Sequence, residues 1–208
     1  MGGSWRESGA GSHNPVLVAA ADDNWRYRKG TSEASSPINA WRHPGFEEDA
    51  SWLVGRTPVG YGDGDDHTEL LDMPNNYSSV YLRHEFVLPP NAIPQSLTLR
   101  VYVDDGAVVW INGTEVARMY VPAGELVYNA TANNHNAVWE ELVLNDAANY
   151  LVGGTNVIAV HALNVSLGGS SDFSIDVELT SNDPPPTTLG MPTPGFRNGV
   201  WSAAAPPQ

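Results

Sequence analysis

The sequence contains no cysteine, which excludes disulfide bridges and thiolate metal sites. Basic residues are also scarce, with 10 Lys and Arg against 24 Asp and Glu and a net charge of −14. A surface of this charge repels phosphate backbones and anionic lipids, so we expect neither nucleic acid nor a membrane as a partner. It is compatible with neutral ligands and with divalent cations.

Long apolar runs are missing too, and no stretch approaches the length of a membrane span. The opening MGGSWRESGAGSHNP lacks the charged and then apolar pattern of a signal peptide. We therefore expect that any signal peptide was removed or was never attached to this chain. Residues 1–14 are small and polar, so we predict a flexible N-terminal segment.

Catalytic signatures are equally absent from the sequence. The six histidines show no HxH or HExxH spacing, and there is no GxSxG motif or Gly-rich phosphate loop. Glu140 and Glu141 are adjacent carboxylates, but neighbours on a strand point to opposite faces and cannot flank one bond. We therefore predict that this chain is not an enzyme.

The stretch at 97–118, LTLRVYVDDGAVVWINGTEVAR, has the clearest structural pattern. Leu97, Leu99, Val101 and Val103 alternate with polar residues, the period of a strand with one buried face. Asp104-Asp105-Gly106 then predicts a turn. The abundance of Gly and Pro, with only 16% charged residues, also favours a loop-rich β protein.

A hairpin is predicted directly after this strand. Asn112-Gly113 is the pair that best tolerates two positive φ angles, so a type I′ turn should join residues 107–111 to 114–118. The predicted cross-strand pairs are Ile111 with Thr114, Trp110 with Glu115, and Val109 with Val116. Trp110 then lies on the outer face of the sheet, opposite Val109 and Ile111.

The DDGAVVWING run is similar to a segment of the galactose-binding-like β-sandwich domains found beside glycoside hydrolases and other secreted enzymes. WLVGRTPVGYG at 52–62, YLRHEFVL at 81–88, and GTNVIAVHALN with SSDFSIDVEL within 154–179 fit the same pattern in the same order. This resemblance covers most of residues 25–179. It implies a jelly-roll β-sandwich, but it does not name a ligand, because one fold carries many functions.

Further elements follow from the local composition. Strands are expected at 15–21, 80–88, 138–144, 156–163 and 173–179, with helical turns at 46–52 and 147–151 and long loops at 58–76 and 122–136. Trp52 is expected to anchor the core. Residues 15–180 should form one sandwich module, and 181–208 a Pro- and Gly-rich linker or extended tail. A linker implies neighbouring domains in a larger, secreted or cell-surface protein.

An acidic loop at 61–69 is the candidate metal site. Asp63, Asp65, Asp66 and Glu69 supply closely spaced carboxylates, and the intervening Gly permits a tight turn, which suits Ca²⁺. The spacing begins like an EF-hand loop but lacks its downstream ligands. The alternative is a solvated turn, since Asp-Gly runs are often only that.

A second acidic group lies beside the predicted strand ends. Asp104, Asp105 and Asp172 fall in segments that match the resembled family, so a ligand or calcium contact is one interpretation. The other is local bonding of their side chains to the backbone, which would hold the strand corner and the Ser170-Ser171-Asp172 turn.

Aromatic residues carry the prediction of function. Pyranose rings pack their C–H faces on flat aromatic side chains, and polar groups bond the hydroxyls. The candidate ligand-binding residues, in or near long loops, are Trp41, Tyr61, Tyr120, Tyr128 and Arg118. We predict a non-catalytic carbohydrate-binding module that holds a secreted enzyme near a polysaccharide. The alternative is a structural or adhesion module, which would bury the Trp110 face under a neighbouring domain.

Overall fold

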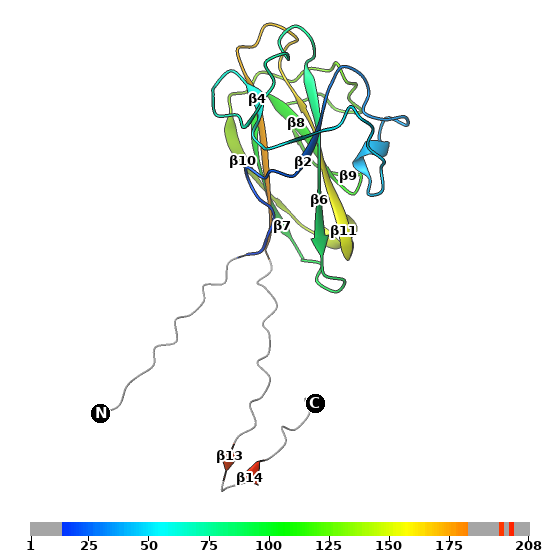
Figure 1. Ribbon diagram of the computed structural model, residues 1–208, viewed down its shortest axis with the longest axis vertical. Helices are drawn as coiled ribbons and strands as arrows, with labels where there is room; N and C mark the ends of the chain where they lie inside the picture. Colours follow the sequence, from blue (N-terminus) through cyan, green and yellow to red (C-terminus); the bar gives the residue numbers. More distant parts are fainter. Residues whose placement is uncertain (1–13, 183–195, 198–199, 202–208) are drawn as a thin grey trace, which may run out of the picture.

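The computed structural model describes residues 14–182, 196–197 and 200–201. Two six-stranded sheets lie face to face (Figure 1). The first, sheet A, runs in the order β10 (Val138–Leu144), β7 (Leu97–Asp104), β12 (Phe173–Ser181), β4 (Val59–Tyr61) and β5 (Thr68–Glu69), with β1 (Val16–Val18) also paired to β12. The second, sheet B, runs β3 (Leu53–Gly55), β2 (Trp25–Lys29), β6 (Ser79–Leu88), β11 (Gly154–Leu163), β8 (Gly106–Ile111) and β9 (Thr114–Met119).

The predicted all-β sandwich is confirmed. Every strand pair in the two sheets is antiparallel except β4 with β5. Two 3₁₀ turns, η1 (Ala40–Arg42) and η2 (Ala147–Asn149), are the helical elements among the described residues. Residues 46–52 form no helix, so that prediction is wrong; the chain makes a single turn there, in which the backbone N–H of Trp52 donates to the Asp49 carbonyl at 3.2 Å.

A further strand pair, β13 (Phe196–Arg197) with β14 (Val200–Trp201), falls in the segment predicted to be a linker. The remainder of 183–208, and the predicted flexible segment up to residue 13, lie outside the described residues.

The main core lies between the two sheets. Leu97, Leu99, Val101 and Val103 are fully buried, as their alternation predicts. Inward side chains of β12, β6, β8 and β11 meet them in one cluster. Burial of aliphatic side chains of this size stabilises the fold by about 2 kcal/mol each, so the interior of the sandwich holds the sheets together.

A second cluster covers the outer face of sheet B. Trp41 packs edge to face on Trp110, with ring centroids 5.7 Å apart, and Trp52 packs beside Trp41 at 6.2 Å. The predicted outward direction of Trp110 is right, but its own chain covers it, and it is only 4% exposed. Trp52 anchors this second cluster and not the main core.

Sheet A, in contrast, is open on its outer face. The residues of β7 alternate between buried and half-buried, and β10 is mostly exposed. Every residue of β8 in sheet B is buried. The centre of sheet B is therefore buried on both faces, whereas sheet A turns one face of β7 and β10 toward solvent.

The β8–β9 hairpin turns where the sequence predicts. Asn112 and Gly113 have φ of 50° and 85°, as a type I′ turn requires. Ile111 pairs with Thr114 and Trp110 with Glu115, but Val109 pairs with Ala117. The predicted Val109–Val116 pair is wrong because a bulge shifts the register by one residue.

Candidate functional site

A polar hollow of about 210 Å³ opens at one end of the sandwich. Its walls come from the link between β7 and β8, the loop that precedes β10, and the loop that precedes β12. The residues that line it are Asp104, Asp105, Asn134, His135, Asn136, Val165, Gly169, Ser170, Ser171 and Asp172. We call this hollow the end pocket.

The chain crosses from one sheet to the other beside this pocket. Asp104 is the last residue of β7 in sheet A, and Gly106 is the first residue of β8 in sheet B. The peptide bond between Asp104 and Asp105 is cis. This short crossover places two carboxylates at the same corner of the sandwich.

Both carboxylates bind the surrounding loops. Asp105 accepts hydrogen bonds from the backbone N–H of His135 at 2.9 Å and of Val165 at 2.6 Å. Asp104 accepts one from the N–H of Ala137 at 3.1 Å. Charged acceptors make strong hydrogen bonds, so the loops that form the walls are held in fixed positions.

Asp172 completes the acidic group from the third wall. Its Oδ1 accepts from the hydroxyl of Ser171 at 3.1 Å and lies 3.4 Å from that of Ser170. The backbone carbonyl of Asp172 accepts from the amide of Asn164, which also donates to the Tyr61 hydroxyl. The bonds of Asp104 and Asp105 to backbone N–H groups match the second interpretation of these residues. Their shared location with Asp172 is a finding of the structure.

The charges in the end pocket repel one another. Burial, followed by the charges of Asp105 and Asp172, raises the pKa of Asp104 to about 6. Burial also raises the pKa of Asp63, with contributions from Asp172 and Asp65. The acidic loop at 61–69 lies close to the end pocket, because a side chain at Gly62 would come within 2.5 Å of the Ser171 carbonyl oxygen. The two acidic groups singled out in the sequence therefore converge.

The predicted metal ligands are not gathered into one coordination shell. Asp66 Oδ1 accepts from the Ser174 hydroxyl at 2.8 Å, and Asp65 accepts from the Tyr102 hydroxyl at 3.3 Å. Asp63 and Glu69 are exposed. Within the described residues no group of three or more His, Asp or Glu side chains has the arrangement to hold a metal ion. Calcium binding by Asp63, Asp65, Asp66 and Glu69 stays a prediction.

An aromatic stack borders the end pocket. The Tyr120 ring lies on the His135 ring, with centroids 3.7 Å apart and 19° between the planes. The Tyr120 hydroxyl donates to Glu140 at 2.6 Å, and Tyr120 is 38% exposed. Among the predicted sugar-binding aromatics, Tyr120 presents an accessible ring next to a cluster of hydrogen-bonding groups.

The other predicted sugar-binding residues lie elsewhere. Trp41 is fully buried and Tyr61 is 8% exposed, so neither ring presents an open face in this structure, and sugar binding by these two residues stays a prediction. Tyr128 packs partly buried against the second cluster. Arg118 is half-buried and bonded to Glu115 at 2.7 Å and to the Pro122 carbonyl at 2.7 Å. Loop composition alone suggested exposure, but the segments of Trp41 and Tyr128 fold back onto the second cluster over sheet B, and Tyr61 ends β4 in sheet A and packs in the main core.

Several pocket residues were not singled out from the sequence. Asn134, His135 and Asn136 come from a loop that composition marks only as rich in Asn, and Ser170 and Ser171 were noted only as part of a turn. Their convergence on Asp104 depends on how the sheets pack. The sequence signal for this site was limited to the DDG segment at 104–106 and the SSD segment at 170–172, which lie beside predicted strand ends in the segments that match the resembled family.

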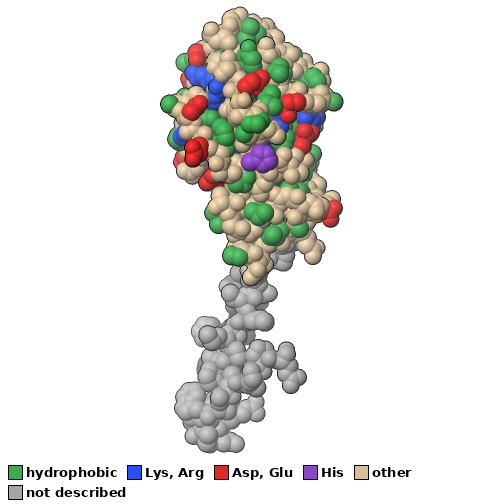
Figure 2. All heavy atoms as spheres, turned by 90° about the vertical axis from the view of Figure 1, so that its right-hand side faces the viewer, with side chains coloured by type: hydrophobic (Ala, Val, Ile, Leu, Met, Phe, Trp, Pro, Cys, Tyr) green, Lys and Arg blue, Asp and Glu red, His purple; other side chains and the backbone are tan. Residues whose placement is uncertain are grey.

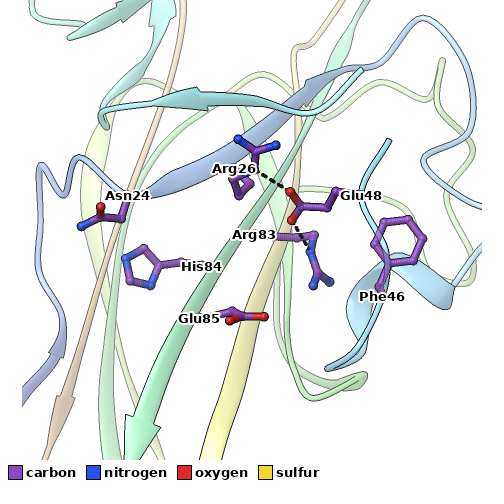
Figure 3. Close-up of a pocket in the computed structure, with 7 residues that line it drawn as sticks. All are labelled: Asn24, Arg26, Phe46, Glu48, Arg83, His84 and Glu85. Atoms are coloured by element: carbon purple, nitrogen blue, oxygen red, sulfur yellow. Dashed lines mark hydrogen bonds and ion pairs between the residues drawn. The ribbon is translucent and has the colours of Figure 1, made fainter. Parts of the chain in front are cut away.

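A second hollow, of about 440 Å³, lies against β2 and β6 of sheet B (Figure 3). Arg26 and Arg83 flank the Glu48 carboxylate there, with Nε to oxygen distances of 2.5 and 3.1 Å. Arg83 also donates to the backbone carbonyls of Trp41 and His43. These contacts hold the segment at 31–52 on sheet B, so the charged residues of this hollow have a structural role.

Charged side chains form no separate basic area on the face that Figure 2 shows, where Lys and Arg lie beside acidic residues. Among the described residues, no helix is long and apolar enough to cross a membrane.

Comparison with solved structures shows the fold. A Bacteroides uniformis β-glucuronidase 2, covalently bound to cyclophellitol-6-carboxylate aziridine, matches 81% of this chain at 17% identity with a TM-score of 0.52. A Ruminococcus gnavus β-glucuronidase in complex with D-glucaro 1,5-lactone matches 78% at 12% identity with a TM-score of 0.51. At such identities the likeness establishes the β-sandwich fold alone.

The matched region is a small part of each enzyme. This chain covers 18% of the Bacteroides protein and 29% of the Ruminococcus protein. No protein-family model matches the sequence, and no curated protein matches it either.

Proposed function

We propose that this sandwich is a non-catalytic carbohydrate-binding module that serves a glycoside hydrolase within a larger secreted protein, and that it takes a neutral sugar in the end pocket. The observation that carries the proposal is the pocket itself. Three loops bring carboxylates, amides and hydroxyls around one small hollow, with the Tyr120 ring at its border.

The chemistry of these groups suits a sugar. Pyranose hydroxyls need both acceptors and donors, which Asp172 and Asn134 supply, and their C–H faces pack on aromatic rings. A sugar carrying its own carboxylate would meet Asp104, Asp105 and Asp172 at short range, where like charges repel. The proposed ligand is therefore neutral.

The position of the pocket favours a tethered binding module. Asp104 pairs with Ser174, whereas Leu97 at the other end of β7 pairs with Ser181. The backbone N–H of Ser181 donates to the Pro15 carbonyl, so the chain enters and leaves the sandwich at that far end (Figure 1). Eight residues of β7 separate the two ends by about 25 Å, which leaves the pocket clear of both attachments.

The likeness to parts of β-glucuronidase structures supports an accessory role beside a hydrolase. The alternative of a structural or adhesion module needed the Trp110 face free for a neighbouring domain. Trp41 and Arg42 cover that face instead, with the Arg42 guanidinium 3.9 Å from the Trp110 ring. No observation favours the alternative over sugar binding.

Isothermal titration against neutral and acidic polysaccharides tests the proposal. We expect heat of binding with at least one neutral polymer and none with polyuronates. Asp172→Ala should abolish it, because it removes the carboxylate from one pocket wall.

Asp23→Ala is the matched control, since Asp23 is an exposed carboxylate outside the pocket with its side chain 77% exposed. Equal binding by both variants, or no binding to any polymer, would overturn the proposal.

A further inference from the structure

The outer face of sheet A carries a group of side chains that the fold does not need to cover its core. Trp139 of β10 lies next to Tyr102 of β7, its cross-strand partner, with ring centroids 5.6 Å apart. The planes are inclined at 47°, and Trp139 is 38% exposed. Two rings that point away from the interior form a shallow aromatic surface.

Polar groups flank these rings. The Arg100 guanidinium lies 4.6 Å from the Trp139 ring and is 3.1 Å from a carboxylate oxygen of Glu178. Glu141 lies on its other side at 3.8 Å. We call Tyr102, Trp139, Arg100, Glu141 and Glu178 the sheet platform. It combines apolar ring faces with hydrogen-bonding groups, as a sugar surface does.

The sheet platform is continuous with the end pocket. Asp104 and Tyr102 are two residues apart on β7 and point to the same side of the sheet, which separates them by about 7 Å. The Tyr102 hydroxyl donates to Asp65, in the acidic loop near the pocket. A chain of sugar units leaving the pocket along β7 would meet Tyr102 and Trp139 next.

We infer that the sheet platform binds further units of a neutral glycan chain whose first unit is held in the end pocket. The inference rests on the proposed function and names its substrate class: an oligosaccharide or polysaccharide chain, and not a free monosaccharide.

Charge selects a neutral chain over an acidic one. The platform has one guanidinium between two carboxylates, and the end pocket beyond it adds further Asp residues. An anionic polymer would be repelled along the whole path. The exposure of Trp139 and the openness of this sheet face leave room for a flexible chain to lie along the strands.

Titration with a length series tests this inference. Glucose, cellobiose, cellotetraose and cellohexaose are compared with xylose and the matching xylo-oligosaccharides. We expect the dissociation constant of the preferred series to fall about tenfold or more from the monosaccharide to the longest oligomer. Trp139→Ala should remove this gain and leave monosaccharide binding unchanged, whereas Trp139→Tyr should retain most of it.

Val54→Ala, at an apolar residue of β3 that is 64% exposed, is the control and should keep the length dependence. Circular dichroism and melting confirm that each variant is folded. A monosaccharide bound as tightly as its hexamer, or an unaltered length dependence in Trp139→Ala, would overturn the inference and leave the proposed function standing. Absence of binding to both series and to every neutral polymer would overturn both.

Self-association is the other explanation for an exposed Trp139, because β10 is an edge strand and edge strands can pair with a second copy of the chain. Analytical ultracentrifugation tests it. A concentration-dependent dimer that Trp139→Ala abolishes would assign the platform to self-association and overturn the inference.

Discussion

Tyr120 and His135 form a parallel stack at 3.7 Å, and the backbone N–H of His135 is bonded to the Asp105 carboxylate inside the end pocket. The position of the exposed aromatic ring is therefore set by the same carboxylate that holds the pocket wall. A ring fixed in this way loses little conformational entropy when a ligand packs on it.

Tyr120→Ala should weaken binding of the neutral sugar identified by titration about tenfold, because the ring face is lost. Tyr120→Phe should bind nearly as well as the wild type, since it keeps the ring and removes only the hydroxyl that donates a hydrogen bond to Glu140. The measurement is the dissociation constant for both variants. A Phe variant as weak as the Ala variant would show that the hydroxyl, and not the ring, makes the contact.

The sequence predicts the sandwich well because its main signals are local. Strict alternation places Leu97 and Val101 in the core, and Asn112-Gly113 sets the hairpin turn. Whether a loop aromatic is exposed depends instead on long-range packing. Trp41 lies in a segment with loop composition, yet Arg83, distant in sequence, binds the backbone of that segment and holds it on sheet B.

The candidate site was predictable only in part for the same reason. Asp104, Asp105 and Asp172 stand out as acidic residues beside strand ends, but their common location depends on the crossover between sheets. His135 has no sequence signal of its own. It becomes a site residue because its backbone is bonded to Asp105.

Replacement of Gly113 tests the hairpin turn. Gly113→Val should destabilise the domain by about 2 kcal/mol, because a β-branched residue fits poorly at a φ of 85°. A side chain there would also meet the His43 ring. Thermal melting measures the loss.

Comparison with Gly124→Val separates the two causes, since Gly124 has a φ of 86° and open space around it. A melting temperature unchanged by Gly113→Val would mean that the turn is not of type I′.

Glu48 is predicted to stabilise the second cluster through its two guanidinium partners. Glu48→Gln keeps the shape but removes the charge between Arg26 and Arg83, and the Arg83 side chain is only 3% exposed (Figure 3). A buried cation without its counter-charge is costly, so we expect a loss of about 2 kcal/mol in the free energy of unfolding. Chemical denaturation measures it.

Glu85→Gln is the matched control, because Glu85 is an exposed carboxylate that lines the same hollow. Equal losses in the two variants would show that the central position of Glu48 has no special role.

The raised pKa of Asp104 predicts how stability depends on pH. Its folded-state pKa of about 6 lies above the ordinary 3.8 of an unfolded Asp, so the folded state binds the proton more tightly. The contribution of this group to stability is greatest below the unfolded pKa and is lost as pH rises through about 6. Burial similarly raises the pKa of Asp66 to about 6, and this group acts in the same direction.

Asp104→Asn should therefore stabilise the domain at pH 7 by about 1 kcal/mol, a value reduced for the solvent that enters the pocket. It should also shrink the rise in melting temperature between pH 7 and pH 5. A variant that melts lower than the wild type at pH 7 would show that the hydrogen bond from Ala137 outweighs the charge repulsion.

The final prediction concerns calcium at the acidic loop. Asp63, Asp65, Asp66 and Glu69 lie within seven residues of sequence, yet the described structure does not gather them into a coordination shell. Binding would have to bring these carboxylates together, at a cost that the ion offsets by neutralising their repulsion. Because burial and the charges of Asp172 and Asp65 raise the pKa of Asp63, the loop and the end pocket already repel each other.

Millimolar calcium should therefore raise the melting temperature, and a chelator should lower it. Binding to the folded state alone stabilises it by about 2.7 kcal/mol when free ion is a hundredfold above its dissociation constant. Asp63→Asn combined with Asp65→Asn should abolish this response and leave the metal-free melting temperature equal or slightly higher, since repulsion is relieved.

If neither calcium nor chelator moves the wild-type melting curve, the predicted calcium site does not exist. A response that survives the double substitution would place the ion elsewhere, and Asp104, Asp105 and Asp172 would be substituted next, because their carboxylates already share one pocket.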